Sequence, residues 1–166
     1  FGVICGVNKG VITNCKVVNN NFKIVNNANV FGELKIFVNV NENIEAFVGG
    51  LVGVNEGYIT NCGVGLNSND YSNSMIIESK AQMGGLVSVN SKKIAGSYVL
   101  NTAIYNNSLS KITGGFVSEN QNGAVISTSY VQGYSEKPLE IHESLKDGGI
   151  FANGNVGGFV AINEGH

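Results

Sequence analysis

Two histidines, His142 and His166, are the first residues whose chemistry could serve an active site. His142 is followed by Glu143, the pair that opens the His-Glu-x-x-His zinc motif, in which two histidines one helical turn apart bind the metal. The segment Ile141–Ser144 lacks the second histidine. We therefore interpret His142 as a solvated loop residue, and we predict no metal site, no cofactor and no catalytic residue.

Acidic side chains gather in one segment. Glycan-cleaving enzymes built as β-solenoids carry clustered acidic side chains on one face of the solenoid. Acidic side chains are sparse in the repeated motif of this chain. The segment is interpreted as the solvated face of a short helix over 138–146, with Pro138 at its start and Gly148 beyond its end. The sequence therefore favours a protein that is not an enzyme. The four acidic residues of the segment are Glu136, Glu140, Glu143 and Asp147.

The charge pattern bears on possible partners. The net charge is −2, and all ten positive residues are lysines. Because arginine is the preferred side chain for bidentate contacts to phosphate and guanine, nucleic acid is not an expected partner. The sequence contains no run of about 18 apolar residues, so we expect no membrane insertion.

The composition favours short strands. Hydrophobic residues make up 43% of the 166 residues and charged residues 13%, about half the usual charged share of roughly 25%. Asn occurs 25 times and Gly 23 times, whereas Pro occurs once. Gly and Asn tolerate left-handed backbone angles and have poor helix propensity, so we expect strands joined by tight bends.

One motif recurs five times. Its clearest copy runs from Gly49 to Cys62 with the sequence GGLVGVNEGYITNC, and a close copy runs from Gly2 to Cys15. The last copy ends after Asn-Glu-Gly, and neither end carries a capping repeat, so we expect both ends to be boundaries of a fragment. The repeats are placed near residues 2–18, 49–65, 84–99, 114–131 and 157–166.

The spacing of the repeats indicates the fold. Equivalent asparagines are 47, 35, 30 and 43 residues apart, which is too irregular for a helical array. The pattern predicts an all-β parallel β-helix (solenoid) of about five coils, formed as one unit by residues 1–166, with irregular loops. Long excursions are expected at 19–43, where Glu33–Val40 can add a strand, and at 133–148. In the second repeat we expect three strands, near Leu51–Val54, Tyr58–Val64 and Met75–Ser79.

Stacked coils place equivalent residues directly above one another, about 4.8 Å apart. Identical apolar residues then pack in columns, and each buried Val or Ile contributes about 1.5–3 kcal/mol. The double Gly before each strand is expected to let the backbone bend with no side chain in the corner. One predicted column holds Val52, Val87, Val117 and Val160, with Cys5 in the first coil; a second holds Ile12, Ile59, Ile94 and Ile126.

Asparagine recurs at one position in all five copies. Stacked amides can hydrogen-bond along the solenoid axis, because each amide carries both donors and an acceptor. The alternative is that each asparagine adopts a left-handed turn conformation. The recurrence favours the ladder. The predicted structural ladder consists of Asn8, Asn55, Asn90, Asn120 and Asn163.

Cys15 and Cys62 share another repeat position, which Ser97 and Ser129 fill in later copies. A column of Cys and Ser indicates a small, buried position. Residues stacked directly in parallel coils also suit disulfide geometry poorly. We expect the cysteines to be buried free thiols.

The segment Gly49–Cys62 resembles the GLUG-type repeat, as does Gly2–Cys15, and the other three copies are recognisably similar. Such repeats occur in large secreted bacterial surface proteins, including filamentous-haemagglutinin-like adhesins and the non-catalytic regions of IgA-cleaving metallopeptidases. The third copy departs from the motif, with Lys92-Lys93 where Gly-x is expected, so its bend is expected to differ. The resemblance implies a surface scaffold and no catalytic residues.

Two functions follow as expectations. The first is a structural or adhesive stalk segment of a secreted or cell-surface protein, stacked against neighbouring repeats of a longer chain. The second is a glycan- or receptor-binding module that uses the loops at 19–43 and 133–148, with a host glycan or protein as partner. Exposed aromatics on one face, such as Tyr71, Tyr105 and Tyr134, would favour the second.

Overall fold

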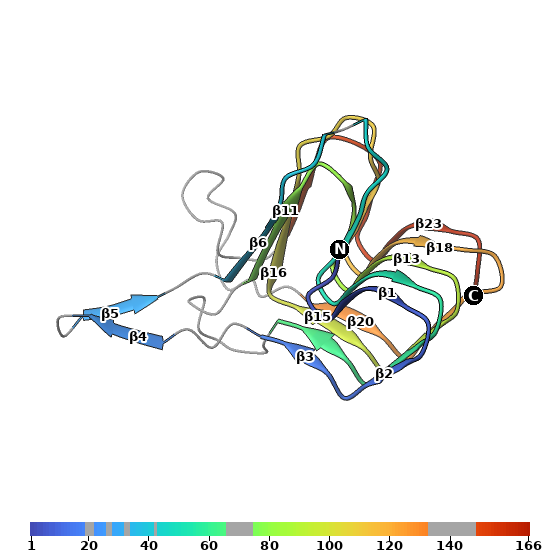
Figure 1. Cartoon of the computed structure of the whole chain (residues 1–166), viewed down its shortest axis with the longest axis horizontal. Coiled ribbons are helices and arrows are strands. Elements are labelled where there is room, and N and C mark those ends of the chain that lie inside the picture. The colour runs from blue at the N-terminus through green and yellow to red at the C-terminus, as the bar shows by residue number, and fades with distance from the viewer. Residues whose placement is uncertain (19–21, 26–27, 32–33, 42, 66–74, 133–148) are drawn as a thin grey trace.

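The computed structural model describes residues 1–18, 22–25, 28–31, 34–41, 43–65, 75–132 and 149–166. All regular structure in these ranges is β-strand, arranged in five parallel sheets and one antiparallel hairpin. Successive coils stack as rungs, with each coil adding one strand to each sheet (Figure 1). The predicted all-β parallel solenoid is confirmed.

We number the five parallel sheets in the order in which a coil passes through them. Sheet 1 contains β7 (Phe47–Gly49), β12 (Gln82–Gly84), β17 (Thr113–Gly114) and β22 (Val156–Gly157). Sheet 2 contains β1 (Cys5–Asn8), β8 (Val52–Asn55), β13 (Val87–Asn90), β18 (Val117–Asn120) and β23 (Val160–Asn163). Sheet 3 contains β2 (Val11–Thr13), β9 (Tyr58–Thr60), β14 (Lys93–Ala95) and β19 (Val125–Ser127). Sheet 4 contains β3 (Lys16–Val17), β10 (Gly63–Val64), β15 (Tyr98–Leu100) and β20 (Tyr130–Gln132). Sheet 5 contains β6 (Leu34–Val38), β11 (Met75–Ser79), β16 (Thr102–Asn106) and β21 (Gly149–Ala152).

The strand register forms the two predicted apolar columns. Cys5 pairs with Val52, and the column continues through the valines of the next three coils. Ile12 pairs with Ile59 in sheet 3, and that column continues to Ile126. Val52 and Ile59 are fully buried. An isolated coil cannot bury these side chains, so the stacking itself forms the core.

Each complete coil contains five strands, so the expectation of three strands per coil is wrong. The segment expected as one strand over 58–64 divides into β9 and β10 at Asn61, whose φ is 53°. The equivalent Asn14, Gly96 and Thr128 also have positive φ, at 57°, 58° and 48°. One left-handed residue therefore turns every coil between sheets 3 and 4. The strand β7, which ends at the first glycine of the double Gly, was also not predicted.

The double Gly bends each coil inward between sheets 1 and 2. A Cβ at Gly49 would collide with the carbonyl oxygen of Val52 in its own coil. A Cβ at Gly50 would collide with the carbonyl oxygen of Gly85 in the next coil. The first glycine therefore lets the chain fold tightly back on its own coil, and the second lets the next coil stack at close distance. As a result the cross-section is L-shaped, with sheets 5 and 1 forming one arm (Figure 1).

Loops of different length enter at one corner, between sheets 4 and 5. In the third coil a single residue, Asn101, joins β15 to β16 with a φ of 44°. In the first coil, the antiparallel hairpin of β4 (Phe22–Val25) and β5 (Ala28–Phe31) comes between the sheet 4 strand β3 and the sheet 5 strand β6. The strand expected over Glu33–Val40 is β6, which belongs to the solenoid and pairs with β11, so the excursion expected over 19–43 is shorter than predicted. The helix expected over 138–146 lies outside the described residues.

Candidate functional site

The five repeat asparagines lie in one column at the end of sheet 2. The amide Nδ2 of each of the first four donates a hydrogen bond of 2.8 Å to the Oδ1 of the asparagine in the next coil. The bonds run in one direction through the stack, from Asn8 to Asn163. Asn55, Asn90 and Asn120 have no exposed surface. The column therefore satisfies buried polar groups where the strand ends and the coil bends.

The ladder side chains also hold the bend that follows sheet 2. The Gly57 N–H donates to the Asn55 Oδ1 over 3.3 Å, and the Asn55 Nδ2 donates to the Gly57 carbonyl over 3.0 Å. Asn90 makes the same pair of bonds with the backbone of Lys92, at 3.4 and 3.3 Å. The bend of the third coil therefore keeps these contacts despite Lys92-Lys93, contrary to the expectation of a different bend.

The left-handed turn conformation belongs to other residues. None of the five ladder asparagines has a positive φ, whereas Asn14 and Asn61, six residues further along their repeats, do. The repeat thus uses two kinds of asparagine. The ladder residues act through their amides, and Asn14 and Asn61 act through their backbone angles.

A second polar column runs through Cys15, Cys62, Ser97 and Ser129. The backbone N–H of Cys15 donates to the Cys62 Sγ over 3.4 Å, and the Cys62 N–H donates to the Ser97 Oγ over 3.2 Å. The Ser97 N–H then donates to the Ser129 Oγ over 3.2 Å. Because the sulfur of Cys and the hydroxyl oxygen of Ser can both accept this hydrogen bond from the backbone N–H, either residue can occupy the position.

All three cysteines are free thiols, as expected. Only Cys62 is fully buried, however, since Cys5 and Cys15 lie in the first coil, where no further coil covers them. Burial raises the pKa of the Cys62 thiol above the ordinary value of 9.0. A thiol in this state is a poor nucleophile at neutral pH, because the thiolate is the reactive form.

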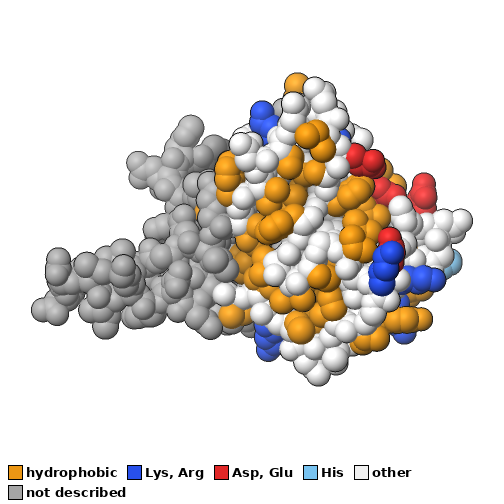
Figure 2. Space-filling model, in the orientation of Figure 1, with side chains coloured by type: hydrophobic (Ala, Val, Ile, Leu, Met, Phe, Trp, Pro, Cys, Tyr) orange, Lys and Arg blue, Asp and Glu red, His pale blue; other side chains and the backbone are white. Residues whose placement is uncertain are grey.

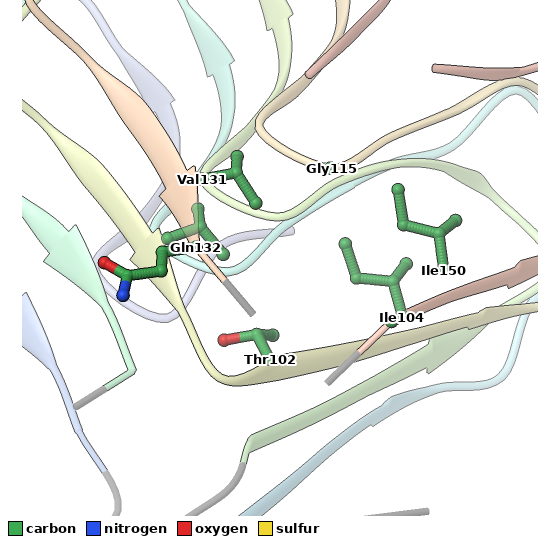
Figure 3. Close-up of a pocket in the computed structure, with 8 residues that line it drawn as sticks. Thr102, Ile104, Gly115, Val131, Gln132 and Ile150 are labelled. Atoms are coloured by element: carbon green, nitrogen blue, oxygen red, sulfur yellow. The ribbon is translucent and has the colours of Figure 1, made fainter. Parts of the chain in front are cut away.

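An apolar pocket opens where the core ends, between sheets 4 and 5 of the fourth coil (Figure 3). Its volume is about 260 Å³, and Ile104, Ile150 and Val131 point into it. Ile104 is 1% exposed, whereas the stacked Ile150 is only half-buried. Among the described residues, the pocket is therefore the open end of the core.

A second hollow, which we call the corner groove, follows the inward bend between sheets 1 and 2. Its volume is about 330 Å³, and its lining comes from three successive coils. Acidic side chains gather beside the notch between the two arms of the molecule (Figure 2). At the corner, the Ser88 hydroxyl donates to the Gln82 carbonyl over 2.9 Å and the Ser118 hydroxyl donates to the Ser88 carbonyl over 2.6 Å. The first bond ties sheet 1 to sheet 2, and the second joins neighbouring coils within sheet 2.

Glu119 lies in the groove at a position where other coils carry apolar residues. Its Cα partners are Val89 and Ile162. The Gln82 Nε2 donates to one Glu119 carboxylate oxygen over 3.2 Å, and the Gln121 Nε2 donates to the other over 3.1 Å. Glu119 was not predicted as a site residue, although the replacement of Val by Glu in the fourth copy was visible in the repeats.

The other candidates from the sequence do not form a site in the described part of the chain. His166 is exposed, and His142 and the acidic segment 136–147 lie outside the described residues. Tyr105 stacks on Phe151 with ring centroids 4.7 Å apart, whereas Tyr71 and Tyr134 lie outside the described residues. Within the described ranges, no three His, Cys, Asp or Glu side chains are grouped so that they could hold a metal ion. A search of the same ranges found no helix with the length and hydropathy needed to cross a membrane.

Comparisons of the chain with protein-family models, with curated proteins and with solved structures found no match.

Proposed function

We propose that this chain is a structural or adhesive stalk segment of a secreted or cell-surface repeat protein and that it carries out no catalysis. The observation that carries this proposal is the use made of the repeated side chains. The Asn ladder, the Cys/Ser column, the Val and Ile columns and the double glycines all serve contacts within a coil or between coils. Repeats whose side chains serve mainly to stack one coil on the next are typical of proteins that form long, stiff scaffolds.

The ends of the stack support the same proposal. Ile126 and Val160 are only half-buried, although the equivalent Ile94 and Val117 have no exposed surface. The open pocket between sheets 4 and 5 offers further apolar surface to a following coil. We propose that the partners at these ends are neighbouring repeats of a longer chain, which would continue the same columns.

A surface location is part of the proposal, because the motif resembles repeats of secreted bacterial surface proteins. Antibodies raised against the chain should label intact cells of its source without permeabilisation. Labelling that requires permeabilised cells would contradict the proposed location.

The mechanical role can be measured on the chain itself. Pulled between its ends by atomic force spectroscopy, a stalk segment should resist and then unfold at a defined force. Asn55→Ala should lower that force, since Asn55 joins three coils. A chain that extends smoothly at low force, as an unfolded polymer does, would contradict the stalk.

The hairpin β4–β5 favours a second candidate, a glycan- or receptor-binding module. It extends away from the coils in Figure 1, at the corner where the third coil needs one residue. A variant that lacks the hairpin tests this candidate against the unaltered chain. It replaces residues 19–33 by a single asparagine, the connection that Asn101 makes in the third coil. Glycan-array binding that this variant loses would support the second candidate, whereas a stalk segment that does not use the hairpin predicts the same result with both chains.

A further inference from the structure

We propose that the corner groove binds an extended, lysine- or arginine-bearing peptide segment of a partner protein, with Glu119 as its principal charged contact. This site goes beyond the stalk function, because the residues that line the groove do not belong to the Asn ladder, the Cys/Ser column or the Val52 and Ile59 columns. It also differs from the loops considered above, since every contributing residue lies on or beside the strands of sheets 1 and 2.

The charge of the groove favours a cationic ligand. Glu45, Glu56 and Glu119 line the groove, and no lysine is among its described lining residues. Lys9 forms an ion pair with Glu56 over 3.6 Å, but both side chains are well exposed, at 78% and 46%. Exposed pairs of this kind contribute about 0–1 kcal/mol, so the groove keeps an acidic character that complements a cationic partner.

Glu119 is held in a fixed position by its hydrogen bonds. The two Gln amides hold its carboxylate in an otherwise apolar rank between Val89 and Ile162. Each Gln amide engages one carboxylate oxygen by a single bond, and a carboxylate oxygen accepts more than one. A Lys or Arg side chain entering the groove can therefore add a charge-assisted hydrogen bond without displacing either glutamine.

The shape and polarity of the groove favour an extended ligand. Val54 and Val89 pair in register and form an apolar wall, with Phe47 on the sheet 1 side. The lining spans three coils, or about 10 Å along the axis at the usual strand spacing. The carboxylates are too dispersed to hold one metal ion among the described residues, so the matching positive charges must also be dispersed. An extended peptide with alternating charged and apolar side chains meets these requirements.

A neutral sugar chain fits the groove less well. Among the described lining residues, Phe47 supplies the only aromatic ring. Sugar binding draws much of its affinity from rings that stack on the pyranose face, and carboxylates give a neutral sugar no charge complement. An oligosaccharide is therefore kept as an opposing outcome of the test.

The test measures binding of acetyl-Lys-Val-Lys-Val-Lys-amide to the 166-residue chain by calorimetry at low and at physiological salt. Binding should weaken as salt rises, because the contacts are electrostatic and partly exposed. Glu119→Gln should weaken it by about tenfold, as expected for loss of one charge-assisted hydrogen bond. The matched control, Glu78→Gln, removes the same charge from sheet 5 and should leave the affinity unchanged.

A second variant guards against misfolding of the first. Glu45 is exposed, so Glu45→Gln should fold normally and still weaken peptide binding. Three outcomes would overturn the proposal: no binding of the lysine peptide, equal loss of affinity in Glu78→Gln and Glu119→Gln, or binding of cellohexaose in place of the peptide. Weakening by Glu119→Gln and Glu45→Gln, but not by Glu78→Gln, supports it.

Discussion

Replacing Asn55 by alanine tests the ladder at its most enclosed point. The side chain has no exposed surface and joins three coils. The substitution removes four hydrogen bonds, each no longer than 3.3 Å, to Asn8, to Asn90, and to the N–H and carbonyl of Gly57. It also leaves the Asn8 amide with a weaker contact, to the Tyr58 carbonyl at 3.3 Å.

The expected loss of stability follows from these bonds. At a net value of about 1 kcal/mol per bond, Asn55→Ala should lower the free energy of unfolding by about 4 kcal/mol. For a chain of this size, 1 kcal/mol corresponds to about 2–4 °C in Tm, so the midpoint should fall by about 8–16 °C. Asn55→Gly should cost at least as much, since it loses the same bonds and glycine adds backbone entropy to the unfolded chain.

The assay is thermal unfolding followed by far-UV circular dichroism. Asn163→Ala serves as the matched control, because Asn163 is exposed and accepts a single ladder bond, from Asn120. Its Tm should fall by no more than about 2–4 °C. The reasoning is refuted if Asn55→Gly is nearly silent, or if Asn55→Ala costs no more than Asn163→Ala.

Three further predictions concern other columns. Gly85→Ala places a Cβ against the backbone of the next coil and should lower the free energy of unfolding, measured in urea, by about 3 kcal/mol. At the equivalent Gly158 a Cβ meets no atom within 4 Å, so Gly158→Ala should be nearly neutral, and equal effects of the two substitutions would contradict this explanation. Thr128→Asn should raise Tm by about 2–4 °C, because asparagine tolerates the φ of 48° better than a β-branched residue, and a lowered Tm would show that the Thr128 hydroxyl bond to the Gly96 N–H matters more. Cys62 should resist alkylation at pH 8 while Cys15 reacts, and rapid modification of Cys62 in the folded chain would argue against its burial. The contribution of the protonated Cys62 thiol to stability should be present below pH 9 and should be lost as the pH rises through the raised pKa of Cys62.

The sequence by itself determined the stacked architecture. A motif that recurs with the same residue types at the same positions requires every column to tolerate contact with itself, and only a few residues do so. Val and Ile pack on their own copies, Asn bonds to its own copy, and Gly leaves space for the backbone of the next coil. The parallel fold and the Val52 and Ile59 columns could therefore be deduced without coordinates.

The ends of the strands and the bends between them were harder to predict from the sequence. Strands of two to five residues are too short for an alternation pattern to mark their ends, so five strands per coil were read as three. The bend between sheets 3 and 4 depends on one left-handed residue, which is Asn in two coils, Gly in a third and Thr in a fourth. A residue type that varies so widely gives no consistent signal.

Only the tertiary structure decided the corner groove. The double Gly permits a bend, but the packing of sheet 1 against sheet 2 sets its inward direction and leaves a hollow beside it. Glu119 and Gln82 lie 37 residues apart in sequence and meet because neighbouring coils stack in register. Local sequence can show that Glu119 interrupts an apolar rank, whereas the partners that hold its carboxylate follow from contacts between coils, which local sequence does not encode.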